Sequence, residues 1–183
     1  MARGDWPPSP GWRWTGCVQV GRPSLTGMNF NGLPLHPLVV HLVVVLAPAA
    51  ALLAITYGLA PRWRWWSRLP LLVASVVGAL ATYVAAASGD SLKEALGERS
   101  QLIEVHEMWA GRLQASMWVL ALLSLVAWWV LPVITPLEGR SDRAARYGAL
   151  VTPLRVVLPI VGLIVIFLVF KTGDAGARAV WAG

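Results

Sequence analysis

Three histidines have the side-chain chemistry that best suits a metal ion or a haem iron: His36, His41 and His106. The first two lie in the segment GLPLHPLVVH, residues 32–41, where Pro37 suits the first position of a helix and puts His36 at the N-cap. His41 follows inside an apolar run, where an ionisable side chain needs a partner and is a candidate for function. Because a separation of five residues rotates a helix by about 140°, we do not expect His36 and His41 to share one metal ion.

His106 opens the third apolar segment, within the sequence EVHEMW, at a depth similar to that of His41. Arg112 is the one basic residue at this helix entry. We expect its guanidinium to pair with an anionic ligand group or with one of three carboxylates, those of Asp90, Glu107 and Asp174.

The sharpest hypothesis for these residues is a b-type haem held by His41 and His106 from two helices. Helical bundles build cofactor sites from side chains on facing helices, and imidazole is a common axial ligand of haem iron. In this hypothesis Arg112 neutralises a haem propionate, and His36 caps its helix or hydrogen-bonds a propionate.

Two alternatives for the histidines stay open. In the first, all three are structural and cap a helix or form hydrogen bonds between helices. In the second, they hold a divalent metal ion together with neighbouring carboxylates. The metal ligands would again include His41 and His106, with oxygen ligands from Asp90, Glu104, Glu107 or Asp174.

The elements that carry these residues are membrane helices. Hydrophobic residues make up 57% of the 183 residues and charged residues 13%, whereas a soluble domain is about 45–50% apolar and about 25% charged. Four apolar stretches approach the roughly 20 residues that a helix needs to cross the hydrocarbon; they run over about 37–60, 69–88, 103–131 and 154–170. Since in lipid only a helix satisfies its backbone polar groups within one segment, the sequence predicts an all-α integral membrane four-helix bundle.

Residues 1–27 differ from the rest, because they are rich in Pro, Gly, Trp and Arg and show neither helical nor strand period. They also lack the apolar core of a signal peptide. We expect a disordered tail, or a natural start at Met28, followed by a transmembrane domain over residues 28–183. The one cysteine, Cys17, lies in this tail, so a disulfide within the chain is excluded.

The sequence also indicates two duplicated helical hairpins. The second apolar segment ends in Ser-Gly-Asp (88–90) and the fourth in Thr-Gly-Asp (172–174), while His41 and His106 lie early in the first and third. An ordinary glycine helix end explains the Gly-Asp pairs equally well. If the duplication holds, the histidines and the two Gly-Asp segments meet at one membrane face.

Lys and Arg residues set the expected orientation. Seven lie in the first and third loops: Arg62, Arg64, Arg68, Arg140, Arg143, Arg146 and Arg155. The opposite side has Lys93, Arg99, Lys171 and Arg178, to which Arg3, Arg13 and Arg22 are added if the tail is counted. We therefore expect a multi-pass protein of the plasma (inner) membrane with both termini extracytoplasmic.

The sequence lacks the motifs of several other functions. The net charge of +6 comes from Arg in short loops, which does not indicate nucleic-acid binding. There is no GxSxG, HExxH or phosphate loop, so we expect no autonomous catalysis. The helix centres carry hydroxyls rather than ionisable side chains, which argues against a transporter.

The HPxxVH pattern at residues 36–41, together with the Gly-containing segment Thr172–Gly176, resembles a family of bacterial four-helix membrane proteins, the domain of unknown function 2231 family. The resemblance covers about residues 30–181; Leu42-Val43 replaces the Phe-Pro that often follows the second histidine in the family. Some relatives are fused to Rieske-type iron–sulfur domains, which implies membrane redox chemistry near haem or quinone.

The leading functional prediction is therefore a membrane subunit that binds haem b and transfers electrons to a membrane or extracytoplasmic redox partner. The rival prediction is a cofactor-free accessory subunit of a larger membrane complex. It would pack through its Trp-rich faces and through the small residues of the second segment, which also leave homo-oligomerisation open; these are Ala74, Gly78, Ala81 and Ala85.

Overall fold

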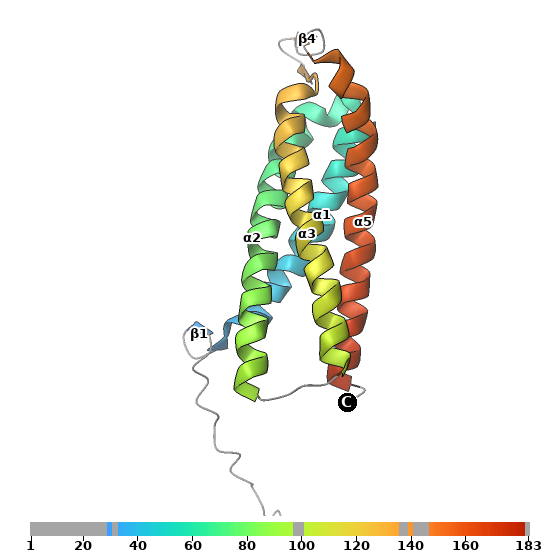
Figure 1. The fold of residues 1–183 in the computed structure, drawn as a ribbon. Helices are drawn as coiled ribbons and strands as arrows, with labels where there is room; N and C mark the ends of the chain where they lie inside the picture. Colours follow the sequence, from blue (N-terminus) through green and yellow to red (C-terminus); the bar gives the residue numbers. More distant parts are fainter. Residues whose placement is uncertain (1–28, 31–32, 97–100, 136–138, 141–146, 182–183) are drawn as a thin grey trace, which may run out of the picture.

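Four long helices form an upright bundle in the computed structural model, which describes residues 29–30, 33–96, 101–135, 139–140 and 147–181 (Figure 1). They are α1 (Leu35–Leu59), α2 (Arg64–Leu96), α3 (Gln101–Val130) and α5 (Gly148–Trp181), with the 3-10 turn η1 (Pro61–Trp63) between the first two. All four are long and apolar enough to span a membrane. The all-α membrane bundle is confirmed; the tail over residues 1–27 lies outside the described residues.

Two small antiparallel strand pairs accompany the helices. β1 (Asn29–Phe30) pairs with β2 (Leu33–Pro34) before α1, and β3 (Ile134–Thr135) pairs with β4 (Gly139–Arg140) between α3 and α5. Each strand is two residues long, and both pairs lie outside the membrane-spanning helices.

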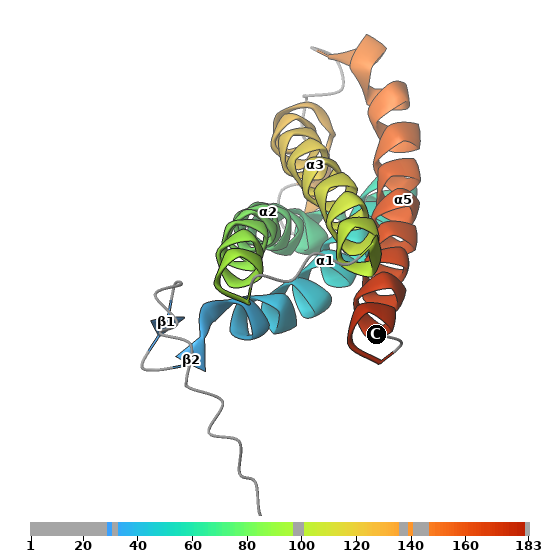
Figure 2. The ribbon, with the colours of Figure 1, turned by 60° about the horizontal axis from the view of Figure 1, so that its bottom comes forward.

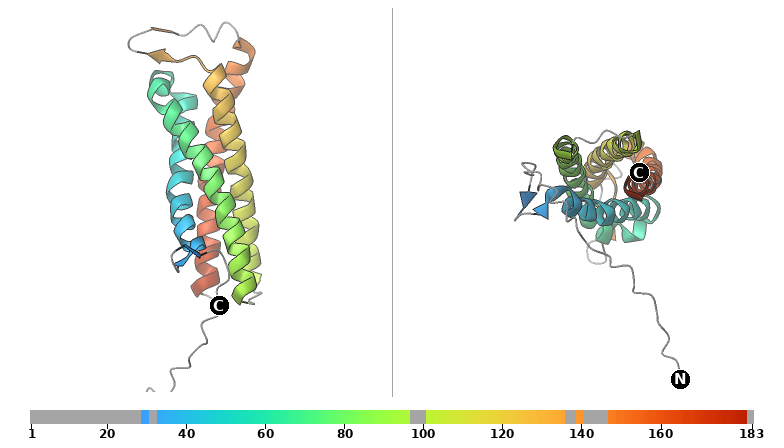
Figure 3. Two further views of the ribbon diagram at one scale, coloured as in Figure 1. Left: turned by 90° about the vertical axis from the view of Figure 1, so that its left-hand side faces the viewer. Right: turned by 90° about the horizontal axis from the view of Figure 1, so that it is seen from below.

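The helices are arranged as a ring of four. α1 packs against α2 and α5, and α3 packs against the same two helices, so α1 and α3 lie diagonally opposite each other. The views along the bundle show this order (Figures 2 and 3). The chain therefore forms two antiparallel hairpins, α1–α2 and α3–α5, laid side by side.

α2 and α5 extend beyond the apolar stretches expected at 69–88 and 154–170, reaching Leu96 and Trp181. The Ser-Gly-Asp and Thr-Gly-Asp segments were expected to end these helices, but both lie inside them. Hydropathy marks where a helix leaves hydrocarbon, whereas the backbone hydrogen bonds continue for two or three further turns into the polar interface.

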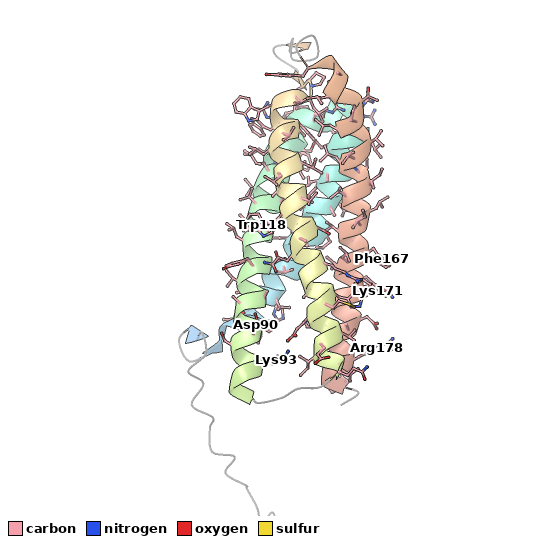
Figure 4. All side chains as sticks on the ribbon, viewed as in Figure 1. Asp90, Lys93, Trp118, Phe167, Lys171 and Arg178 are labelled. Carbon is pink, nitrogen blue, oxygen red and sulfur yellow. The ribbon has the colours of Figure 1, made fainter. Side chains whose placement is uncertain are left out.

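We call the end of the bundle with the starts of α1 and α3 and the ends of α2 and α5 the histidine end; it is the lower end in Figure 1. The opposite end, with η1 and the start of α5, is the arginine end. Asp90, Lys93 and Arg178 lie toward the histidine end (Figure 4).

Most buried positions of α1 are buried again in α3 when 70 is added to the residue number. Six pairs illustrate this: Val43/Leu113, Ala47/Met117, Ala50/Leu120, Ala51/Ala121, Ala54/Ser124 and Tyr57/Ala127. α2 and α5 correspond in the same way with a shift of 87, through Ser67/Leu154, Leu71/Leu158, Ser75/Gly162, Gly78/Val165, Ala81/Leu168 and Ser88/Ala175. The two hairpins thus bury the same faces, as expected of a duplicated unit.

Small residues let neighbouring helices approach closely. A Cβ added at Gly162 of α5 would lie 2.8 Å from Ala51 O of α1, and one at Gly78 of α2 would lie 2.6 Å from Met117 Cε of α3. The predicted small-residue face of α2 is therefore a contact face within the bundle, on which Ala74, Gly78 and Ala81 are buried.

Arg64 closes the arginine end and is only 2% exposed. Its guanidinium donates to Tyr57 O at 2.9 Å and Gly58 O at 3.2 Å, carbonyls in the last turn of α1, and to Pro132 O at 3.4 Å just after α3. The last carbonyls of a helix lack partners within it, and a charged side chain within a membrane span is commonly neutralised by such carbonyls. One arginine, expected only to set orientation, thus joins the two hairpins.

Replacing Arg64 by Met should lower the free energy of unfolding by at least about 3 kcal/mol, because two buried carbonyls and one half-buried carbonyl lose a charged donor and each such hydrogen bond contributes about 1.5–3 kcal/mol. Unfolding of the micellar protein by sodium dodecyl sulfate, followed by circular dichroism, measures this. Arg62→Met is the matched control, since Arg62 is exposed. Equal stability of the two variants would contradict the capping role.

Candidate functional site

His36 packs from the start of α1 onto the end of α2. Its Nδ1 lies 2.8 Å from Ala85 O, and since a carbonyl only accepts, this nitrogen carries the proton. Ser88 Oγ, which donates to Ala85 O at 3.0 Å, lies 3.3 Å from the same nitrogen. The ring rests on Gly89, where an added Cβ would lie 3.2 Å from His36 Cε1.

His106 makes the same arrangement between α3 and α5. Its Nδ1 lies 3.1 Å from Thr172 O, and its ring rests on Gly176, where an added Cβ would lie 3.1 Å from both Cε1 and Nδ1. Both imidazoles are half-buried. Each is therefore held by a backbone carbonyl and a glycine of its partner helix.

The two histidine sites are equivalent under the shifts that relate the buried faces. A shift of 70 takes His36 to His106, and a shift of 87 takes Ala85 to Thr172 and Gly89 to Gly176. From the repeats within the sequence, we had instead expected His41 to correspond to His106 and Gly89 to Gly173. That alignment of α2 with α5 is wrong by three residues, because Gly89 corresponds to Gly176. A Cβ added at Gly173 would have no neighbour within 4 Å, so no histidine rests on it.

His41 lies elsewhere on α1. It is exposed, and its Nδ1 lies 2.6 Å from Pro37 O in its own helix. Its equivalent in the second hairpin is Gly111, not a histidine. No contact among the described residues joins His41 to His106, so haem ligation by this pair stays a prediction.

Arg112 does not pair with the carboxylates expected for it. Glu107 binds Lys93 at 2.7 Å, an ion pair that joins α3 to α2, and Asp174 binds Arg178 at 3.1 Å within α5. The guanidinium of Arg112 instead stacks over the Trp109 ring, 4.7 Å from its centroid. It is exposed on the outer surface of the bundle.

The polar groups around the histidines are few. Among the described residues, no three side chains of His, Cys, Asp or Glu gather into one group, as a carboxylate-rich metal site would require. Beside His106, Thr172 Oγ1 is buried, and within the described part of the chain it has no hydrogen-bond partner. A buried hydroxyl without a partner is unusual in a protein, so this position has an unused polar group next to an imidazole.

The three Nδ1–carbonyl contacts determine which nitrogen carries the proton in each neutral imidazole. Neutral histidine carries one ring proton, so a proton on Nδ1 leaves the Nε2 lone pair free to accept or to bind a metal. Within the described residues, no hydrogen bond uses the Nε2 of His36 or His106. The Nε2 atoms of His36 and His106 thus keep a free lone pair in the neutral ring.

In the neutral state His36, His41 and His106 should therefore all be protonated at Nδ1. ¹⁵N-edited NMR of the histidine side chains in micelles at pH 8 measures this directly, and the same protein unfolded in urea is the reference, since its rings face water. Dominance of the Nε2–H form at His36 or His106 in the folded protein would contradict the carbonyl contacts.

Comparison with known proteins identifies one family. The sequence model described as "Predicted membrane protein (DUF2231)" matches residues 32–183, which include all four helices and the three histidines. No curated protein and no solved structure matches the chain. The match bears out the resemblance seen in the sequence.

Proposed function

Because the chain belongs to the DUF2231 family of predicted membrane proteins, we propose that it works within the membrane as an electron-transfer subunit that holds a b-type haem through His36 and His106. The proposal rests on one observation, the equivalence of these two imidazoles. Each has Nδ1 on a carbonyl, its ring on a glycine and its Nε2 unused within the described residues. Two neutral imidazoles from two helices are the donor set of a six-coordinate haem iron.

The ligand pair differs from the one that the sequence suggested. His36 and His106 come from diagonally opposite helices and are related by the duplication, whereas His41 is exposed and bonded within α1. α2 and α3 diverge toward the histidine end (Figure 1), where the Lys93–Glu107 ion pair connects them. Both histidines are half-buried at this end of the bundle.

The protein residues orient the group and set its surroundings. Ala85 O and Thr172 O hold the rings and increase the basicity of Nε2, and the hydroxyl of Thr172 offers a buried hydrogen bond. A haem held by His36 and His106 would supply one-electron transfer. This agrees with the absence of catalytic motifs from the sequence.

The distribution of Lys and Arg between the two ends predicts the orientation of the bundle in the membrane. Lys and Arg are more frequent in the loops of the arginine end, which favours the cytoplasmic side of a bacterial plasma membrane. In this orientation the histidine end is extracytoplasmic, and the redox partner is a membrane or extracytoplasmic protein that approaches from that side.

Visible spectra of the purified protein test the ligand pair. After expression with added haem, the reduced protein should show sharp α and β bands that are lost in His36→Ala and in His106→Ala but retained in His41→Ala. Loss in His41→Ala with retention in His36→Ala would restore the pair suggested by the sequence. A colourless wild-type protein would reject haem binding and favour the cofactor-free accessory subunit.

A pair of glycine variants separates ligand geometry from general folding. Gly176→Val puts a branched side chain where a Cβ alone already lies 3.1 Å from the His106 ring, so the bands of a bis-histidine haem should disappear. Gly173→Val lies one turn earlier in open space and should leave them unchanged. Identical spectra for the two variants would contradict His106 as an axial ligand.

A further inference from the structure

Two cations share one aromatic ring on the outer surface of the second hairpin. The guanidinium of Arg112 lies 4.7 Å from the centroid of Trp109, and Lys171 Nζ lies 5.9 Å from the same centroid. Phe167 meets Trp109 edge-on at 6.3 Å and is 5.8 Å from Lys171 Nζ. α3 and α5 thus bring two positive charges together over a pair of aromatic rings.

These two charges lack the usual partner. The ion pairs of the described residues are Lys93–Glu107 and Arg178–Asp174, and neither includes Arg112 or Lys171. Cation–π contact contributes only about 0.5–1 kcal/mol at an exposed site and leaves the N–H donors of both side chains available. Arg112 and Lys171 therefore have both the positive charge and the free hydrogen-bond donors that an anion-binding site needs.

The pair lies at the depth of lipid headgroups. Arg112 precedes the exposed Trp129 by 17 residues, or about 26 Å of helix, close to the thickness of the hydrocarbon. Toward the middle of the bundle, the surface of α5 is apolar and open: Leu163 is 60% exposed and Phe167 is 52% exposed. Phe167 and Lys171 are four residues apart, so they lie about one turn from each other on α5 (Figure 4). A headgroup at the cations therefore has an apolar surface beneath it for its acyl chain.

The duplication shows that this site is not required by the fold. The positions equivalent to Trp109, Arg112, Phe167 and Lys171 in the first hairpin are Val39, Leu42, Leu80 and Val84. That surface is an ordinary apolar membrane face, with Leu42 and Leu80 exposed. The same backbone thus carries two costly charges at the hydrocarbon boundary in the second hairpin only.

We propose that Arg112, Lys171 and Trp109 form a binding site for the phosphate of an anionic phospholipid, with an acyl chain along Phe167 and Leu163. The arginine fork matches phosphate oxygens in a bidentate manner, and lysine adds a second charge. A zwitterionic lipid carries its own ammonium group, so an anionic headgroup complements the two cations better. This site rests on the contacts of Arg112 and Lys171 with Trp109 and does not require haem.

Native mass spectrometry in neutral detergent, with phosphatidylglycerol or phosphatidylcholine titrated in, tests this site. The wild-type protein should retain one phosphatidylglycerol in preference to phosphatidylcholine. Arg112→Gln and Lys171→Gln should each weaken it about fivefold, since a basic residue near a membrane surface contributes about 1 kcal/mol of lipid attraction. The double variant should weaken it about 25-fold.

Arg178→Gln is the matched control, because Arg178 lies at the same end but pairs with Asp174; it should bind as the wild type does. Unchanged binding in the double variant, or an equal loss in Arg178→Gln, would overturn the site. Displacement of the lipid by millimolar inorganic phosphate would also overturn it, because it would indicate a site for soluble anions rather than one that includes the acyl chain. Melting curves of Arg112→Gln and Lys171→Gln should match that of the wild type, since Arg112 and Lys171 make no ion pair in the described chain.

Discussion

Hydrocarbon offers no hydrogen-bond partner to a backbone N–H or C=O, and the rest of this structure depends on that constraint. It makes each spanning segment a helix, and it requires a partner wherever a helix ends inside the bundle. Arg64 meets this requirement for carbonyls at the ends of α1 and α3. The hydroxyls of the helix centres obey the same rule: Thr82 donates to Ala79 O, and Ser75 and Ser124 join α2 to α3 at 2.8 Å. These hydrogen bonds hold neighbouring helical segments together.

The duplication separates what belongs to the architecture from what was added to it. Both hairpins bury equivalent faces, and both hold a histidine between a carbonyl and a glycine of the partner helix. The histidines therefore belong to the common unit, which is why we assign the central function to them. The cations around Trp109 occur in one hairpin alone, where equivalent positions in the other are apolar. They serve a role of that surface, distinct from the role of the histidines.

The fold was far more predictable than the site. Segments as apolar as those of α1 and α5 allow one structure in lipid, so the number and class of the helices follow from hydropathy. Their ends do not, because Gly89 and Gly173 resemble helix terminators while the backbone of each helix continues past them. The second hairpin was predicted, but its register was aligned on Gly-Asp pairs rather than on the buried positions. Because this alignment was three residues off, it did not identify Gly176 as the residue against which His106 packs.

The sequence by itself determined the membrane bundle, the family, the two-hairpin plan and the three histidines as the residues of interest. Only the tertiary structure decided which histidines are equivalent, that Arg64 joins the end of α1 to the segment after α3 and that Arg112 lies over Trp109. The physical reason is that hydropathy and spacing along the chain give the depth of a residue in the membrane. Contacts also depend on its rotation about the helix axis and on which helix lies beside it, and these are fixed when the four helices pack.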